Sequence, residues 1–164
     1  WTVYHASEGA SKYQRLNDTT GNDPALDFYQ TTPTATQFYA RQGYSVVNET
    51  GYKYIAYLFA TLAGISKVGS YTGNGSNQTI NCGFSAGSRF VLIRRTDANG
   101  DWYYWDSVRG IVAGNDPHLS LNAAAAQVTN DDSVDPHNSG FIVNQVSATN
   151  INVSSGTYIF YAIA

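Results

Sequence analysis

Residues 131–137 read Asp-Asp-Ser-Val-Asp-Pro-His and place three carboxyl groups and an imidazole in one short stretch. Side chains of these types can transfer protons or hold a cation. Together with Asp106 and Asp116, they supply the two carboxylates that a polysaccharide depolymerase requires across a groove. Acidic residues are also common in solvated loops. The chain contains an internal repeat, described below, and the corresponding loop of its first copy carries Thr and Gln instead of these carboxylates. We therefore expect no catalytic residue in this stretch.

Residues 97–101, Asp-Ala-Asn-Gly-Asp, resemble the beginning of a calcium-binding loop, in which alternate oxygens point at one cation. A complete loop also needs a glycine after its third ligand and a glutamate at its twelfth position, and both are missing. Cys82 is the only cysteine, which excludes an internal disulfide and a cysteine-based metal cluster. His5 and His118 have no serine or cysteine nucleophile in a recognisable setting. We expect no metal, no cofactor and no enzymatic activity.

Aromatic side chains are the remaining candidates for a binding site. In a strand over residues 102–105, alternate side chains point to opposite faces of the sheet. A related strand at the start of the chain is apolar at the positions of Trp102 and Tyr104, which assigns these two residues to the core. Tyr103 and Trp105 are then candidates for an exposed platform on which a sugar ring stacks. The alternative is an aromatic interface between subunits or domains.

A β-hairpin over residues 89–106 is expected to position these aromatic residues. Residues 90–94 are rich in β-branched and aromatic types, and residues 102–105 form a second aromatic run. Asn99-Gly100 between them is typical of a type I′ turn, which requires two residues with positive φ.

The second strand of this hairpin occurs twice, because the chain begins with Trp1-Thr2-Val3-Tyr4-His5. Aligning the two copies with a four-residue insertion reveals a repeat with a period near 104 residues, the size of a small domain. The matching pairs are Trp1 with Trp102, Gly9 with Gly110, Leu16-Asn17 with Leu121-Asn122, Pro33 with Pro136, Phe38 with Phe141, and residues 54–60 with residues 158–164.

Residues 61–101 have no counterpart before Trp1, and two interpretations follow. In the first, residues 1–60 are the second half of a repeated β domain in a longer array, and residues 61–164 are a complete copy. In the second, the two halves pair around the central insert in one composite body. We favour the first, because a hairpin strand without its partner would be an exposed sheet edge.

Strand-like runs at 8- to 12-residue spacing predict an all-β fold, an antiparallel β-sandwich of jelly-roll-like type. At most one short helix is expected, over residues 121–128. Loops are expected over residues 18–36 and 130–139. The further strand candidates cover residues 1–5, 6–17, 38–47, 52–60, 65–71, 78–84, 108–121, 141–145, 148–153 and 157–164.

The composition excludes two classes of partner. Charged residues make up 13% of the chain and the net charge is −3, so there is no basic patch for nucleic acid. The most hydrophobic run, residues 54–65, is interrupted by Gly64 and is too short for a membrane span. We therefore expect no nucleic-acid binding and no membrane insertion.

The sequence resembles a tandemly repeated β domain of bacteriophage tail-fibre and other virion structural proteins. The resemblance covers nearly the whole chain, and it rests on residues 1–5, 54–60, 69–75, 90–97 and 99–102. It implies a non-enzymatic structural or adhesive module in the distal part of a phage fibre, located in the virion. It also implies a homotrimer that contacts other virion proteins and a host-surface receptor. The family offers no catalytic or ligand-binding residues to carry over.

Three functions compete at this point. The first is a receptor-binding fibre component that mediates attachment to the host cell. The second is a carbohydrate-binding, lectin-like module, with Tyr103, Trp105 and additionally Tyr29 or Tyr39 as stacking platforms. It overlaps the first if the receptor is a glycan. The third is a polysaccharide depolymerase, for which the acidic residues named above are the only candidate catalytic carboxylates.

Overall fold

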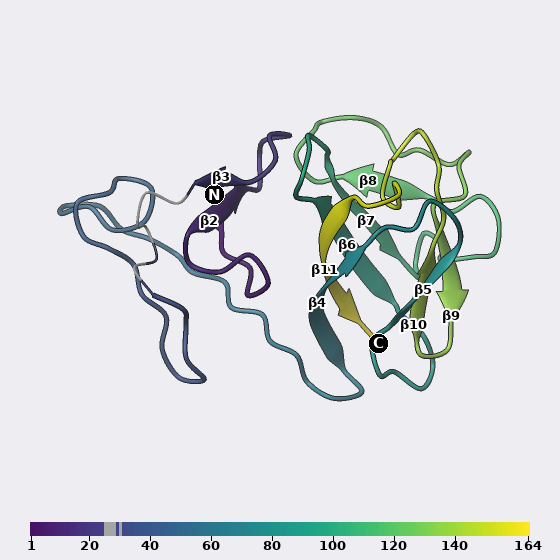
Figure 1. The fold of residues 1–164 in the computed structure, drawn as a ribbon, viewed down its shortest axis with the longest axis horizontal. Coiled ribbons are helices and arrows are strands. Elements are labelled where there is room, and N and C mark those ends of the chain that lie inside the picture. Colours follow the sequence, from purple (N-terminus) through teal and green to yellow (C-terminus); the bar gives the residue numbers. More distant parts are fainter. Residues whose placement is uncertain (25–28, 30) are drawn as a thin grey trace.

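The computed structural model describes residues 1–24, 29 and 31–164 (Figure 1). Within these residues the chain forms β-strands and no helix, so the expected all-β class is confirmed. The strands are β1 (Thr2–Val3), β2 (Lys12–Arg15), β3 (Asp23–Pro24), β4 (Ser66–Thr72), β5 (Gln78–Asn81), β6 (Phe90–Arg95), β7 (Trp102–Asp106), β8 (His118–Ser120), β9 (Val134–His137), β10 (Gly140–Val143) and β11 (Thr157–Ile163).

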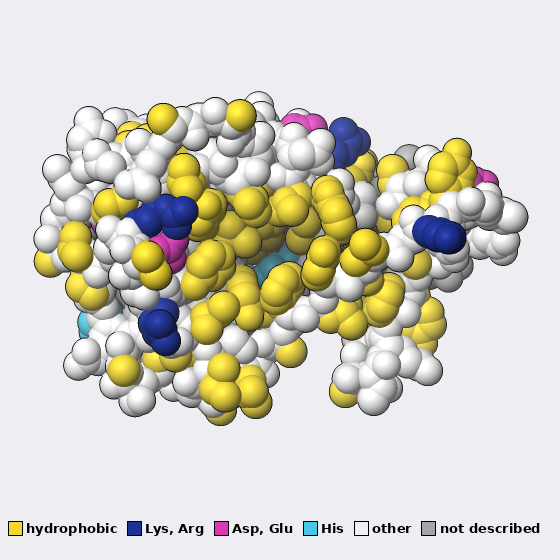
Figure 2. All heavy atoms as spheres, turned by 180° about the vertical axis from the view of Figure 1, so that it is seen from behind, with side chains coloured by type: hydrophobic (Ala, Val, Ile, Leu, Met, Phe, Trp, Pro, Cys, Tyr) yellow, Lys and Arg dark blue, Asp and Glu magenta, His cyan; other side chains and the backbone are white. Residues whose placement is uncertain are grey.

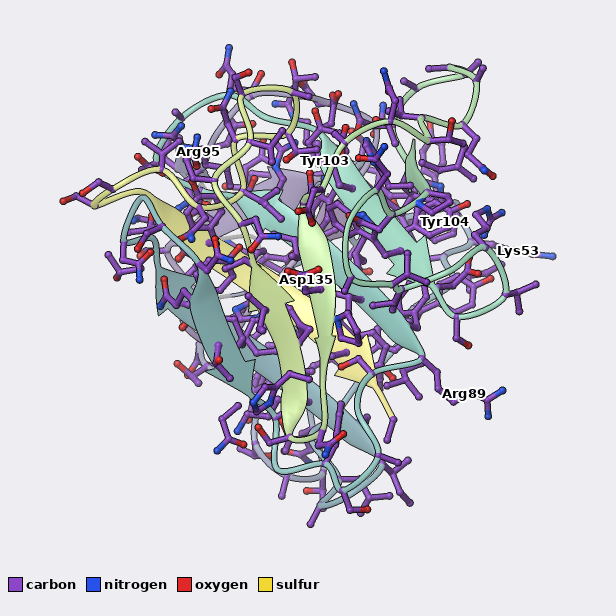
Figure 3. The ribbon with its side chains drawn as sticks, turned by 90° about the vertical axis from the view of Figure 1, so that its right-hand side faces the viewer. Lys53, Arg89, Arg95, Tyr103, Tyr104 and Asp135 are labelled. Atoms are coloured by element: carbon purple, nitrogen blue, oxygen red, sulfur yellow. The ribbon has the colours of Figure 1, made fainter. Side chains whose placement is uncertain are left out.

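Strands β4 to β11 form an antiparallel β-sandwich. One sheet has the strand order β4-β11-β6-β7-β8 and the other has the order β5-β10-β9. Figure 3 looks onto the three-stranded sheet, with the five-stranded sheet behind it. Buried apolar side chains from both sheets form the core between them: Ile80, Val134, Phe141 and Val143 from one sheet, and Val91, Ile93, Trp105, Tyr158, Phe160 and Ala162 from the other. The predicted sandwich is therefore observed.

The central strand β11 is buried between two neighbours. It pairs with β4 over its whole length and with β6 on its other side. Phe160 lies across Gly69 of β4, where an added Cβ atom would meet the phenyl ring at 2.4 Å. A glycine is needed there because the ring occupies the space of a side chain. The apolar pattern of the last predicted strand thus reflects burial on both faces of the sheet.

The predicted hairpin forms, but its turn differs from the expected type. Strands β6 and β7 pair from Phe90 with Asp106 to Arg94 with Trp102. Neither Asn99 nor Gly100 has a positive φ, so the type I′ prediction is wrong. The two strands are joined by residues 96–101, a longer connection.

Contacts to the N-terminal segment hold this connection. The Gly100 amide donates to the Thr19 carbonyl at 2.9 Å, and the Asn22 amide donates to the Thr96 carbonyl at 3.1 Å. Hydrogen bonds to residues distant in the sequence therefore fix the conformation of this connection, in place of the type I′ turn that Asn-Gly favours locally.

Residues 121–128 form turns and irregular structure, which agrees with the expectation of at most one short helix. Two further local predictions are wrong. Residues 148–153 form turns in place of a strand. Strand β9 lies inside the predicted loop 130–139. It contains Pro136, which cannot donate a backbone hydrogen bond, and β9 is accordingly an edge strand.

The N-terminal segment forms a small sheet with the order β1-β2-β3, which lies beside the five-stranded sheet (Figure 1). Arg94 of β6, with 0% of its surface exposed, makes the main connection. Its guanidinium donates to the carbonyls of Asp18, Thr20 and Gly100 and to Gln14 Oε1, the last at 3.3 Å. The Trp102 indole adds a hydrogen bond of 2.9 Å to the Arg15 carbonyl. Buried polar contacts therefore fasten the first copy of the repeat to the second.

The pairing of β1 with β2 repeats the pairing of β7 with β8 in the same register. Thr2 faces Arg15 and Val3 faces Gln14, and the aligned positions in the second copy, Tyr103 with Ser120 and Tyr104 with Leu119, also face each other. The Leu16 amide donates to the Trp1 carbonyl, as the Leu121 amide does to that of Trp102. Asn17 and Asn122 both accept a hydrogen bond from the nitrogen of the aligned tryptophan. The repeat inferred from the sequence is therefore also present in the backbone pairing.

The first copy stops following the second after β3. Residues 38–47 and 52–60, both predicted as strands, form none. Within the predicted strand 6–17, only β2 is regular. The predicted loop 18–36 lies partly outside the described residues, which do not include 25–28 and 30.

Candidate functional site

Strand β7 presents its aromatic residues differently from the expectation. Trp105 is 0% exposed and belongs to the core, so it cannot serve as a surface platform. Its ring centroid lies 6.1 Å from that of Tyr103 and 5.3 Å from that of His118. Tyr103 and Trp105 do share one face, as predicted, but that face is the interior of the sandwich. Trp102 and Tyr104 point to the opposite face, where the Trp102 indole donates to the Arg15 carbonyl and the Tyr104 ring lies 6.0 Å from that of Phe90.

The other predicted stacking residues are scattered. Tyr103 is half-buried, and its hydroxyl donates to the Ala148 carbonyl at 3.4 Å. Tyr29 packs edge-on against Tyr4, with ring centroids 5.4 Å apart. Tyr39 is exposed in the irregular part of the first copy. These tyrosines therefore do not form one platform.

A buried polar cluster, made of Asp116, His118, Asp131, Ser133 and Thr149, lies at one end of the sandwich interior. Asp116 Oδ1 accepts the Ser133 amide at 2.8 Å, and the Ser133 hydroxyl donates to Asp131 Oδ1 at 2.8 Å. His118 Nδ1 lies 3.5 Å from Asp131 Oδ1. Sequence reasoning identified the acidic stretch but missed that it meets Asp116 and His118, because no local pattern predicts this approach.

Burial dominates the protonation of this cluster. It raises the pKa of the Asp116 carboxyl to about 7, although the amides of Val134 and Ser133 favour the charged form. Burial also lowers the pKa of His118, against the attraction of Asp131. Asp116 Oδ2 finds no hydrogen-bond partner among the described residues. The carboxyls are closed off from substrate, because Asp116 is 0% exposed and Asp131 is 8% exposed.

We expect Asp116 to make the protein less stable as the pH rises from 4 to 8. The carboxyl ionises near 3.8 in the unfolded chain and near 7 in the fold, so the folded protein binds an extra proton between these values. Its stabilising contribution is complete below the unfolded pKa and is lost as the pH rises through the folded one. One pKa unit corresponds to about 1.4 kcal/mol. Structural relaxation around the ionised carboxyl makes the cost smaller than the full pKa shift implies. We therefore expect Asp116→Asn to be more stable than the natural chain at pH 8 by on the order of 2 kcal/mol.

Urea unfolding at pH 5 and pH 8 would measure this effect. Asn keeps the oxygen that accepts the Ser133 and Val134 amides, whereas Asp116→Ala removes it and should be destabilising at both values. His118 contributes a slope of the opposite sign below pH 6.5, which both chains share. Equal pH dependence in the natural chain and the Asn variant would contradict the prediction.

The remaining carboxylates of the predicted sites bind neighbouring protein groups. Asp132 and Asp135 both accept the Asn144 side-chain amide, at 2.8 and 3.0 Å. Figure 3 shows Asp135 on β9. Asp97 is paired with Arg95 at 2.9 Å, and Asp101 accepts the Asn122 amide at 2.8 Å. No group of three His, Cys, Asp or Glu side chains within the described residues could hold a metal ion.

Cys82 is a buried thiol, 7% exposed, in the core of the sandwich. Burial raises its pKa to about 11, from 9.0 for a free thiol. Since only the thiolate is nucleophilic, we expect alkylation by iodoacetamide at pH 8 to be about 100-fold slower in the native protein than in the unfolded chain. Mass spectrometry of timed samples would measure the two rates. Similar rates would show that Cys82 is accessible and reactive in the fold.

Residues 54–60, which we call the apolar segment, expose a run of large apolar side chains. Tyr54, Ile55, Tyr57, Leu58 and Phe59 are between 42% and 73% exposed. Figure 2 shows hydrophobic side chains gathered around a hollow between the sandwich and the N-terminal part of the chain. Sequence reasoning assigned these residues to a strand and did not foresee their exposure.

The chain contains no helix, among its described residues, that is long and apolar enough to cross a membrane. No curated protein and no solved structure matches it. One family model matches, over residues 1–164, and its description is a domain of unknown function, DUF7483. Since the match covers both copies of the repeat, the chain belongs to this family.

Proposed function

We propose that the protein is a non-enzymatic structural component of a phage tail fibre that mediates attachment to the host cell surface. It acts as a homotrimer within the virion, where it contacts other virion proteins and a surface receptor. The observation that carries the proposal is the internal repeat, because β1–β2 in the first copy keep the pairing register of β7–β8 in the second. Repeated use of one rigid β unit is how an extended fibre is built from a single module.

The placement of the acidic residues supports a role without catalysis. A glycosidase needs two carboxyl groups on either side of an accessible groove. Asp116 and Asp131 lie in the core instead, and Asp106 is engaged by Arg109 and by the amides of residues 108 and 109. The buried carboxyls of Asp116 and Asp131 are therefore closed to a polysaccharide, which favours a non-enzymatic role over a depolymerase.

The low charge suits attachment by many weak contacts. Three copies on one fibre would multiply a weak affinity by avidity, so each single site needs no deep pocket. A surface covered mainly by neutral polar groups also keeps most of its affinity for a receptor when the salt concentration changes, because salt screens only interactions between charges.

Two measurements test the proposal together. Light scattering should give three times the chain mass of 17.8 kDa. Gold-labelled antibodies against the protein should mark the fibres of intact phage particles in electron micrographs. A label confined to the capsid or missing from particles would overturn the fibre assignment, and a monomeric mass would overturn the trimer.

A lectin-like role remains the second candidate, on a different aromatic pair from the one the sequence suggested. Trp1 is 64% exposed and Tyr57 is 67% exposed, and their ring centroids are 5.7 Å apart. Trp1 also lines a surface depression with Tyr13 and Arg15. Exposed aromatic faces of this kind can stack on sugars. A titration of tryptophan emission with bacterial polysaccharides tests this role, and Trp1→Ala should abolish any response.

A further inference from the structure

The apolar segment is the middle of a longer exposed stretch, residues 52–65, which we call the exposed run. Tyr52 before the apolar segment is 67% exposed, and Leu62 and Ile65 after it are 56% and 55% exposed. An aromatic side chain alone offers roughly 150–250 Å², so the large side chains of the exposed run together present on the order of 1,000 Å². The largest apolar patch on an ordinary monomer is about 300–600 Å². The exposed run is therefore larger than the apolar surface that a monomer leaves uncovered in water.

The exposed run is held against the fold at two points. The Tyr54 hydroxyl donates to the Ser45 carbonyl at 2.9 Å. Further along, the ring of Phe59 lies against that of Tyr161 of β11, with centroids 4.9 Å apart. A partner would therefore bind a segment that is already positioned, and this lowers the entropy cost of association.

The backbone of the exposed run also has few partners. Within the described part of the chain, no amide of residues 53–61 donates a hydrogen bond. Of the carbonyls of residues 52–60, only that of Ala60 accepts one, from the Ser66 hydroxyl. An amide that is buried without an acceptor costs free energy. A partner that covers the side chains must therefore also supply backbone acceptors, as a neighbouring strand does.

The apolar segment is able to form such a strand. It aligns with residues 158–164, and β11 pairs along both of its edges, with β4 and with β6. The same types of residue are therefore compatible with a strand once a neighbour is present.

The composition of the exposed run favours a permanent partner, and a second copy of the chain fits it. Lys53 is the only charged residue of the run. Interfaces between identical chains are more apolar than transient interfaces, and a standard interface buries about 800 Å² on each partner. The exposed run alone can provide this area. A second copy also brings the same free carbonyls that the free amides lack.

We infer that copies of this chain associate through the exposed run, and that the apolar segment then pairs as a strand with the backbone of a neighbouring copy. That the copies number three rests on the proposed function. Leu58 lies in the middle of the contact and is 73% exposed. On either side of it, Tyr57 and Phe59 contact Trp1 and Tyr161 of their own chain. Leu58 is therefore the position at which a substitution disturbs the contact with least effect on the fold.

Light scattering over a series of concentrations tests the inference on the natural chain and on Leu58→Asp. An aspartate would be buried there without a partner in every copy. We expect at least 100-fold weaker association, with the single-chain mass of 17.8 kDa where the natural chain is fully associated. Val108→Asp is the matched control, since Val108 is 93% exposed outside the run and the variant should keep the natural mass. Leu58→Met conserves the volume and should also associate.

Hydrogen exchange followed by mass spectrometry shows whether the same residues form the contact. We expect the amides of residues 53–61 to exchange at least 100-fold more slowly in the associated natural chain than in Leu58→Asp. Strands β6 and β10 should stay protected in both proteins, which would show that the variant is folded.

Two results would overturn the inference. The first is a natural chain that keeps the single-chain mass at every concentration, including one that binds lipid vesicles or another polypeptide instead. The second is association that Leu58→Asp leaves unchanged or that Val108→Asp weakens equally.

The fibre assignment fails or survives separately from the inference. Gold labels on the fibres would keep the assignment even if the chain did not associate through the exposed run. A label confined to the capsid, with association lost in Leu58→Asp, would remove the assignment and support the inference. Two copies joined through the exposed run would support the surface and remove the trimer.

Discussion

Trp105→Ala is expected to lower the free energy of unfolding by about 3–5 kcal/mol, a large part of the 5–15 kcal/mol typical of a domain. The indole is 0% exposed and contacts the rings of Tyr103 and His118 in the core. Its removal would leave a cavity between the two sheets that the surrounding strands can fill only in part. Urea unfolding followed by circular dichroism would measure the loss.

Trp105→Phe is the matched control for this experiment. The indole nitrogen has no hydrogen-bond partner among the described residues, so phenylalanine keeps most of the packing and removes a buried donor. We expect this change to cost less than about 1.5 kcal/mol. If Trp105→Ala itself cost under 1 kcal/mol, the side chain would belong to the surface, and the sugar platform inferred from the sequence would regain support.

Arg94→Ala is expected to cost about 3–5 kcal/mol and to release the N-terminal sheet from the sandwich. Hydrogen bonds from a charged donor contribute about 1.5–3 kcal/mol each before the cost of burying the charge is subtracted. The guanidinium joins three carbonyls from two parts of the chain and lies 5.4 Å from the Trp102 ring. Alanine would leave these carbonyls without their donor.

Hydrogen exchange should show where the Arg94 variant opens first. Residues 12–22 should exchange faster, while strands β10 and β11 stay protected at low urea concentrations. Arg94→Lys keeps the charge but not the planar set of donors, so it should lie between the natural chain and the alanine variant. Uniform destabilisation of all strands, with no early opening at residues 12–22, would contradict the fastening role.

The fold class was predictable because the strands of the second copy are strongly apolar and regularly spaced. β6, β7 and β11 lie where the sequence placed them. The sequence prediction exchanged the core face and the outer face of β7, because both faces are apolar. One face packs in the core, and on the other face Trp102 contacts the N-terminal segment. Alternation identifies the two faces of a strand, but it cannot assign the core when both are covered.

The first copy shows a second limit of sequence patterns. Residues 54–60 have the pattern of β11, and yet they form no strand. A strand is stabilised by its neighbours, so the pattern predicts a structure only if its pairing partners are present. The same reasoning applies to the buried cluster, where Asp116 and Asp131 meet through backbone pairing that no local motif encodes.

The position of β11 between β4 and β6 also bears on how the protein is made. Ser66–Thr72 must wait for Thr157–Ile163 before the five-stranded sheet can close, and ribosomes add about 5–20 residues per second. During those seconds the facing edges of β4 and β6 are open to neighbouring nascent chains. We therefore expect slow closure of the sandwich and a demand for chaperones during rapid synthesis.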